Sequence, residues 1–218
     1  MKPDKKTKLK APQLPEDFIP IQFDEKINAE KHYFNGVIQE TSVVDQTFEH
    51  LEFEKMVFKK SVFQNVSFRD LQLTDVVFDS CDLSNVDFSG AIVHRTELHN
   101  CKLLGANLSE ATFRNVLFDQ CLAKYSSFAF ANFKQVYFQD CSLQNADFYE
   151  IKHKQLDFSK CNLNETNFSG TELNKLDLRS CTFDHITVSL DKLNGCIVSS
   201  EQAVGFAKTL GLVVTEEE

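Results

Sequence analysis

A large apolar residue recurs at every fifth position through most of this 218-residue chain. The series runs without a slip from Val43 to Leu193, and 29 of its 31 positions hold Phe, Leu or Val, with Ala123 and His153 as the exceptions. Five helical steps rotate a side chain by about 140°, and five strand steps place it on the opposite face. Neither element keeps a period of five on one side, so the backbone must turn once per repeat.

A second inward position lies two residues before each of these. There, 29 of 31 residues are small or aliphatic, and only Gln46 and Asp191 are not. Residues two apart in an extended segment face the same way. Of the 36 charged residues between 41 and 193, Asp191 alone occupies a predicted inward position. Because charged groups are almost never buried unpaired, this partition predicts short extended pieces around one axial core.

Several segments carry a more specific pattern, among them VDFSG (86–90), ANLSE (106–110), ADFYE (146–150), CNLNE (161–165) and TNFSG (166–170). The chain thereby resembles the pentapeptide-repeat family, and within it the loop-free Qnr and MfpA type of quinolone-resistance proteins. The resemblance implies an all-β fold, a right-handed quadrilateral parallel β-helix with about 20 residues per coil and nearly eight coils.

Cysteine spacing provides an internal check on the coil length. Six of the seven cysteines recur every 20 residues: Cys81, Cys101, Cys121, Cys141, Cys161 and Cys181. Neighbours stacked at the strand spacing of about 4.8 Å would lie within disulfide reach, which leaves a redox or metal ladder open. A straight stack cannot supply tetrahedral metal geometry, and a reduced buried Cys acts as a small apolar residue. The cysteine spacing therefore favours a packing role for these residues over a redox or metal role.

The chain divides into four predicted segments. Residues 1–24 read as a flexible basic tail with four prolines, 25–40 as an N-terminal cap or imperfect first coil, 41–193 as the β-helix, and 194–218 as a C-terminal helix and dimerisation segment. Ser199 and Gln202 have the spacing of a capping box, and Gly211 is placed to end the helix.

The C-terminal segment carries an apolar stripe followed by further apolar residues. We expect the stripe to cover the last coil, and the resemblance implies that the segment joins two copies tail to tail, although the helix could equally be a monomer's lid. The predicted dimerisation residues are Ala203, Phe206, Ala207, Leu210, Leu212, Val213 and Val214.

Composition narrows the function classes. No apolar run is long enough to span a membrane, and no secretory signal precedes the odd number of cysteines, so a reduced, cytoplasmic protein is expected. A filled rod offers no concave site, and the histidines lack ligand spacing, so we predict no enzyme activity and no cofactor or metal. The net charge of −9 argues against direct contact with nucleic acid and for a basic partner.

Sorting outward residues by their position in the coil separates the charges. Three contiguous sides are net negative and one is net positive. The side centred on Phe48, Phe68 and Phe88, here the acidic face, holds Glu49, Asp70, Asp87, Glu110, Asp147 and Glu150. The basic face holds Lys55, Arg95, Arg114, Lys134, Lys152, Lys154, Lys175 and Lys192. Three aromatic residues outside the inward positions, Tyr125, Phe130 and Tyr149, predict a contact patch.

The resemblance supplies a functional hypothesis. Proteins of the Qnr and MfpA type mimic DNA and occupy the basic DNA-binding saddle of a type II topoisomerase, DNA gyrase or topoisomerase IV, protecting it from quinolones or changing its DNA binding. The acidic face would then contact the enzyme. The alternative is a pentapeptide-repeat scaffold that binds an unrelated protein.

Overall fold

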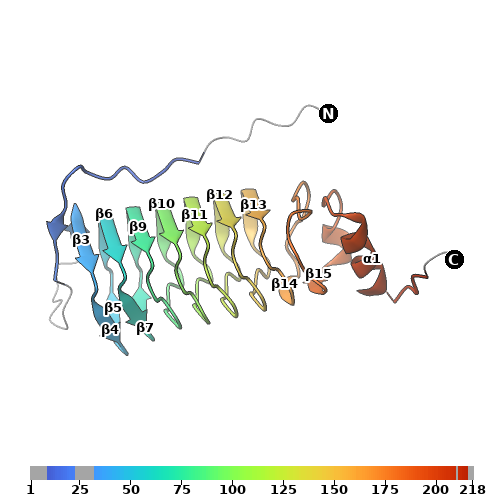
Figure 1. Cartoon of the computed structure of the whole chain (residues 1–218), viewed down its shortest axis with the longest axis horizontal. Coiled ribbons are helices and arrows are strands. Elements are labelled where there is room, and N and C mark those ends of the chain that lie inside the picture. The colour runs from blue at the N-terminus through green and yellow to red at the C-terminus, as the bar shows by residue number, and fades with distance from the viewer. Residues whose placement is uncertain (1–8, 23–31, 210, 216–218) are drawn as a thin grey trace.

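The chain forms a right-handed parallel β-solenoid of about eight turns with about 20 residues per turn, followed by one short helix (Figure 1). The computed structural model describes residues 9–22, 32–209 and 211–215. Strands one coil apart pair in parallel with an offset of 20 residues, as Phe118 does with Phe138. The fold class that the resemblance implies is confirmed.

The longest sheet follows one edge of the rod and joins two of its sides. Its order is β1 (Ile19–Pro20), β3 (Gly36–Gln39), β6 (Glu52–Lys59), β9 (Gln72–Asp79), β10 (Ile92–His99), β11 (Thr112–Asp119), β12 (Asn132–Gln139) and β13 (Lys152–Ser159), with β2 (His32–Phe34) beside β6. The other sides carry the pairs β4 (Ser42–Val44) with β7 (Val62–Gln64), β5 (Thr47–Glu49) with β8 (Ser67–Arg69), and β14 (Thr166–Phe168) with β15 (Ile186–Val188). Isolated bridges continue these sides.

A left-handed residue forms each corner. Every fifth residue from Asn35 to Lys175 has a positive φ, although only three of these corners are glycine. Asn and Asp tolerate this conformation better than other non-glycine residues. Many corner N–H groups donate to a carbonyl of the next coil, as Asn85 does to Leu104 at 2.8 Å. This hydrogen bond holds the corner, so the sequence can place larger residues there.

The core is built from stacked side chains that repeat along the axis. Phe128 and Phe148 stack with ring centroids 4.8 Å apart and planes 11° from parallel, and Phe148 stacks in turn on Phe168 at 5.2 Å. These separations match the strand spacing, because each ring sits one coil above the last. Phe118 meets Phe128 edge to face, so adjacent stacks interlock.

The cysteine ladder lies inside this core. Its six residues are buried with free thiols, and each of the five from Cys101 onward donates to a backbone carbonyl one coil away, such as Cys141 to Phe118 at 3.4 Å. Hydrogen bonding with Cys121 and burial raise the pKa of Cys141 to about 12. A thiol held neutral in this way is a poor nucleophile, in keeping with a packing role.

The N-terminal segment differs from the flexible tail predicted for residues 1–24. Residues 9–22 run along one edge of the rod, over the corners in the middle of the long strands, and then enter the sheet through β1, in which Ile19 pairs with Gly36 (Figure 1). We call residues 9–22 the strap. Residues 1–8 and 23–31 lie outside the described part. Residues 32–40 pair with β6 as an incomplete first coil, one of the two forms predicted for 25–40.

The solenoid ends at helix α1 (Ser200–Thr209), close to its predicted place. The Ser199 N–H donates to Gln202 Oε1 at 2.9 Å, and the Gln202 N–H donates to Ser199 Oγ at 3.2 Å, so the predicted capping box is confirmed. Gly211 has a φ of +81°.

The contact of α1 with the last coil differs from the predicted stripe. Gln202 is buried and its Nε2 donates to the Leu178 and Cys181 carbonyls, both at 2.9 Å. Phe206 meets Phe183 edge to face, whereas Ala203 is exposed. A polar residue therefore docks this helix, because the end of a β-helix presents unpaired carbonyls as well as apolar surface.

Candidate interaction faces

The six predicted acids lie on one side of the rod but do not have equivalent roles. Asp87 Oδ1 accepts the Ser89 N–H at 3.0 Å and the Asn107 amide at 2.9 Å. Asp147 makes the matching pair of bonds, to the Tyr149 N–H and the Asn167 amide. These two carboxylates link neighbouring coils and fix local turns, which a count of surface charge does not indicate.

The remaining four acids are exposed. Glu49 lies 3.7 Å from Arg69 as an ion pair on open surface, and Asp70 lies 3.1 Å from the exposed His50 ring. Pairs of this kind contribute little stability. Glu110 and Glu150 extend the acidic face along the axis, and the Tyr149 hydroxyl donates to Glu150 at 2.8 Å.

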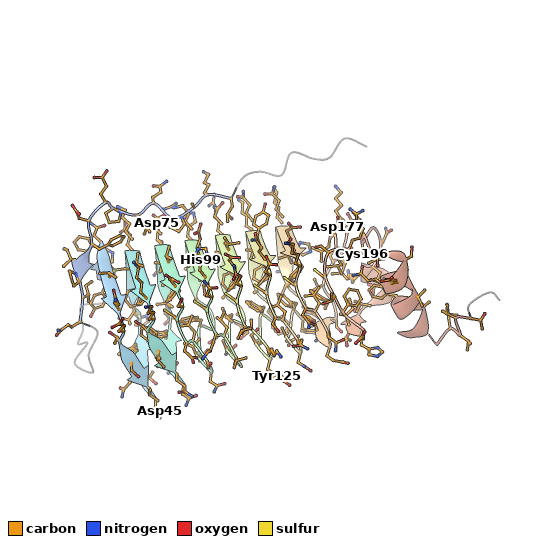
Figure 2. The ribbon with its side chains drawn as sticks, viewed as in Figure 1. Asp45, Asp75, His99, Tyr125, Asp177 and Cys196 are labelled. Carbon is orange, nitrogen blue, oxygen red and sulfur yellow. The ribbon has the colours of Figure 1, made fainter. Side chains whose placement is uncertain are left out.

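The aromatic residues predicted as a contact patch lie on the same part of the surface. Phe130 and Tyr149 meet edge to face with centroids 5.3 Å apart, whereas no ring contact links Tyr125 to either among the described residues. Tyr125 is 67% exposed and Phe130 is 52% exposed. Figure 2 shows Tyr125 across the rod from Asp75.

Both exposed aromatics occupy left-handed corners, with φ of 60° for Tyr125 and 61° for Phe130. Three earlier coils have Asp45, Asn65 and Asn85 at the corner position that Tyr125 occupies. The side chains of these three residues are joined by hydrogen bonds of 3.0 and 3.1 Å. A bulky residue in this conformation is unfavourable, and such strain concentrates at functional sites. The sequence pattern identified the exposure of these rings but not the backbone conformation beneath them.

The strap crosses the corner of the basic face. The buried carboxylate of Asp75 accepts two hydrogen bonds from the Arg95 guanidinium, at 2.5 and 2.6 Å, and one from the Gln13 N–H at 2.8 Å (Figure 2). Burial raises the pKa of Asp75, but the bonds from Arg95 and Gln13 outweigh it and leave the pKa below its usual value. Two coils further on, the Lys10 N–H donates to Asn115 Oδ1 at 3.3 Å.

The two contacts of the strap have the same spacing as the corners that they bind. Lys10 and Gln13 are three extended residues apart, or roughly 10 Å, and the corners of Asp75 and Asn115 are two coils apart, or roughly 9.6 Å. Both corner side chains are 2% exposed, while the corners Asn65 and Asn85 on another edge are exposed. The strap therefore matches the repeat of the rod and covers this edge.

A third polar cluster was not anticipated from the sequence. His99 lies between two acids, with Nε2 3.0 Å from Glu97 and Nδ1 3.2 Å from Asp119 on the next coil (Figure 2). Burial lowers the pKa of His99, but hydrogen bonds to Glu97 and Asp119 outweigh it and raise the pKa above its usual value. The 20-residue spacing of His99 and Asp119 in the sequence indicates that the two residues lie at the same position on adjacent coils.

Other histidines and acids are more dispersed. His153, which replaces an inward Phe, is half-buried and hydrogen-bonded to the Glu172 carbonyl. In the described part of the chain, no three His, Cys, Asp or Glu side chains are grouped as metal ligands, and no helix is long and apolar enough to cross a membrane.

Comparison with known proteins identifies the class. Residues 71–148 and 131–201 match the family described as a pentapeptide repeat region, and the chain belongs to this family. Its members are generally non-enzymatic scaffolds. A curated relative, the uncharacterized protein YisX of Bacillus subtilis, is 39% identical over 93 residues, which cover 43% of this chain and 44% of the relative.

The solved structures to which this chain is similar are more distant in sequence. QnrB1, a plasmid-mediated fluoroquinolone resistance protein, is 18% identical over 81% of this chain and all of its own, with a TM-score of 0.43. HetL, a pentapeptide repeat protein involved in heterocyst differentiation regulation in Nostoc sp. strain PCC 7120, is 15% identical over 77% of this chain and 93% of its own, with a TM-score of 0.38.

Proposed function

We propose that this chain acts in the cytoplasm as a DNA-shaped protein that binds a type II topoisomerase, DNA gyrase or topoisomerase IV, and protects it from quinolones or changes its DNA binding. The observation that carries the proposal is the separation of charge around an uninterrupted rod, with the exposed acids Glu49, Asp70, Glu110 and Glu150 on one side. The sequence resemblance to Qnr and MfpA type proteins directs the choice of partner.

The dimensions support mimicry of shape and sign. Nearly eight coils at about 4.8 Å give a rod roughly 37 Å long, along which duplex DNA presents about 22 phosphates. The three negative sides of the rod hold sixteen acids offset by seven bases, which is a lower charge density than that of DNA. Complementary charge raises the association rate and specificity, and it can do so without a full match in charge density.

The structure refines how the acidic face is tested. Lysine at positions 87 or 147 would break the bonds that hold neighbouring coils, so a loss of binding could come from a damaged fold. Asparagine removes the charge and keeps the acceptor, as Asn107 shows by accepting the Ser109 N–H at 3.2 Å. The sharper variant combines Asp87→Asn, Asp147→Asn, Glu110→Gln and Glu150→Gln.

The test titrates the protein into gyrase supercoiling assays with and without ciprofloxacin. We expect wild type to protect or inhibit gyrase, and the fourfold variant to lose at least tenfold in apparent affinity at unchanged melting temperature. A matched control removes four acids from other sides: Asp79→Asn, Asp140→Asn, Glu165→Gln and Asp184→Asn. If wild type has no affinity for gyrase or topoisomerase IV at low salt, the proposal is wrong.

The proposal includes a tail-to-tail homodimer through the C-terminal segment. Beyond the helix, Leu212, Val213 and Val214 are 59%, 89% and 42% exposed, while Phe206 already packs on Phe183 within the chain. Leu210 lies outside the described residues. Light scattering at micromolar concentration should give a dimer mass, which Val213→Glu should reduce to a monomer mass.

A second candidate is a scaffold that binds an unrelated protein through the aromatic residues Tyr125, Phe130 and Tyr149. The strained corners favour it, because two exposed rings are kept where Asn or Gly would fit with less strain. Tyr125→Asn with Phe130→Gly should leave the melting temperature unchanged or raise it, while weakening capture of the partner. If gyrase binding persists in this variant, the rings are not needed for the topoisomerase contact.

A further inference from the structure

We infer that a row of cations on strands β11–β13 binds the phosphate backbone of nucleic acid. The row consists of Arg114, Lys134 and Lys154, with Lys152 beside it, and is named here the cationic row. This inference goes beyond the proposed function and does not depend on it.

The register of the sheet aligns these side chains. Arg114 pairs with Lys134, and Lys134 pairs with Lys154, so the three cations occupy one position on adjacent strands. At about 4.8 Å per strand, they form a line roughly 10 Å long parallel to the rod axis. All four side chains are exposed. Like charges on adjacent strands are destabilising, so the row favours an anionic partner.

Unlike six other cations of the solenoid, the cationic row has no acid within ion-pair distance in the described part of the chain. Among residues 9–22, 32–209 and 211–215, no ion pair joins the cationic row to an acid. Elsewhere in the same part of the chain, six cations lie within 4 Å of one, in the pairs Lys55 with Glu54, Arg69 with Glu49, Arg95 with Asp75, Lys102 with Asp82, Arg179 with Asp177, and Lys192 with Glu172.

The strap extends the positive region at one end of the row. The Lys10 backbone is held on Asn115, the residue that follows Arg114, and the Lys10 side chain is exposed. Next to it, burial lowers the pKa of His94, and the positive charges of Arg95, Arg114 and Lys10 lower it further. The shift agrees with a positive potential along this edge.

The residues around the row favour phosphate over an acidic protein surface. In segments 112–115, 132–135 and 152–155, the remaining outward side chains are hydroxyl or amide groups, and neither an acid nor an exposed aromatic ring lies among them. Protein interfaces are depleted in Lys and enriched in aromatic residues. Lys, Arg, Thr and Asn are the usual donors to DNA phosphates, and such contacts carry no sequence information directly.

The net charge of −9 predicted the opposite, that the chain avoids nucleic acid. That expectation treats the protein as one sphere of charge, whereas the charges are separated by side. At 0.15 M salt, exposed charges are screened beyond about 8 Å, and opposite sheets lie about 10 Å apart. The cationic row therefore determines the potential at contact, and the acids across the rod limit affinity without preventing binding.

The test measures fluorescence anisotropy of a labelled 20-base-pair duplex with the full chain and no topoisomerase present, so its result is independent of the proposed function. The test variant is Arg114→Glu, Lys134→Glu and Lys154→Glu. The control, Lys102→Glu, Lys124→Glu and Lys160→Glu, makes the same change in net charge on other sides. Circular dichroism establishes that both variants are folded.

We expect wild type to bind unrelated duplex sequences equally, with affinity falling about 40-fold between 50 and 200 mM salt if three phosphates are neutralised. The row variant should lose at least tenfold, and the control less than threefold. The inference is overturned if wild type does not bind at 50 mM salt, or if the control loses as much as the row variant. Competition by poly-glutamate as effective as that by duplex would also overturn it, in favour of an acidic protein partner.

Discussion

The coils in the middle of the rod and those at its two ends bury similar side chains but hold them differently. Phe128 is fully buried, with Phe148 stacked on one side and Phe118 against its edge. Phe48, near the N-terminal end, is half-buried and stacks on Phe68. Middle coils are supported by similar coils on both sides. End coils depend on segments outside the repeat, so a few unique contacts carry their stability.

The largest expected effect is in the middle. Phe128→Asp places an unpaired charge in the core, where loss of a Phe side chain alone costs about 3–5 kcal/mol, so the chain should fail to fold cooperatively. Phe48→Asp at the end of the core should lower the melting temperature but leave a folded rod. Circular dichroism melting compares the two. An unchanged transition for the Phe128 variant would mean that the inward register is wrong.

Next in size is the C-terminal end. Gln202→Ala removes the donor to two backbone carbonyls and half of the capping box, and should cost about 2–3 kcal/mol in the stability of the last coil. Hydrogen exchange should show faster exchange near Leu178 and Cys181 and little change at residues 121–140. Glu201→Ala, on the exposed side of the same helix turn, is the control. Equal exchange in both variants would contradict the docking role of Gln202.

The N-terminal strap should respond to a smaller change. Asp75→Ala removes the acceptor for Gln13 and Arg95, and should release the strap at a cost of about 1–3 kcal/mol. Limited proteolysis should then cleave within residues 9–22 faster than in wild type. Asp45→Ala, at an exposed corner that bonds Asn65, should not change this cleavage. Slow cleavage in the Asp75 variant would show that the strap is held by other contacts.

Low pH should also release the strap and expose it to cleavage. The pKa of folded Asp75 lies below its usual value, so its contribution is present above the unfolded pKa of about 3.9 and is lost as pH falls through the folded pKa. Cleavage of the strap in wild type should therefore increase only at strongly acidic pH, when measured with an acid-active protease. Asp75→Asn should not show this acid step.

The smallest effect involves the middle coils again. The pKa of folded His99 is raised, so its bridge between Glu97 and Asp119 is fully present below the unfolded pKa of about 6.5 and weakens as pH rises through the folded value. We expect the free energy of unfolding to fall by less than about 1 kcal/mol as pH rises through the folded pKa, because the bridge is partly solvated. Denaturant unfolding measured from pH 5 to 9 should show this fall in stability in wild type and not in His99→Gln.

The amino-acid sequence by itself determined the repeating part of this protein. A period of five in Phe and Leu, the inward position two residues earlier, and the 20-residue spacing of cysteines are local regularities. Each depends on which side of the backbone a residue faces, so they predicted the coil, its core and the buried thiols. The capping box at Ser199 and Gln202 is equally local, and the helix begins where it predicted.

The tertiary structure decided what lies on the surface of that coil. The prolines and lysines of residues 1–24 predict a flexible tail, and only the structure shows the strap, in which Gln13 contacts Asp75 across 62 positions. The sequence predicts Asp87 and Asp147 only as surface charges. The structure shows that Asn107 and Asn167 of the next coil donate hydrogen bonds to them. Such contacts join residues that are distant in the chain, and their geometry follows from how coils and strap align in space. The 20-residue repeat places Asn107 beside Asp87, but only the structure shows that the two side chains are bonded, and the repeat gives no position for the strap.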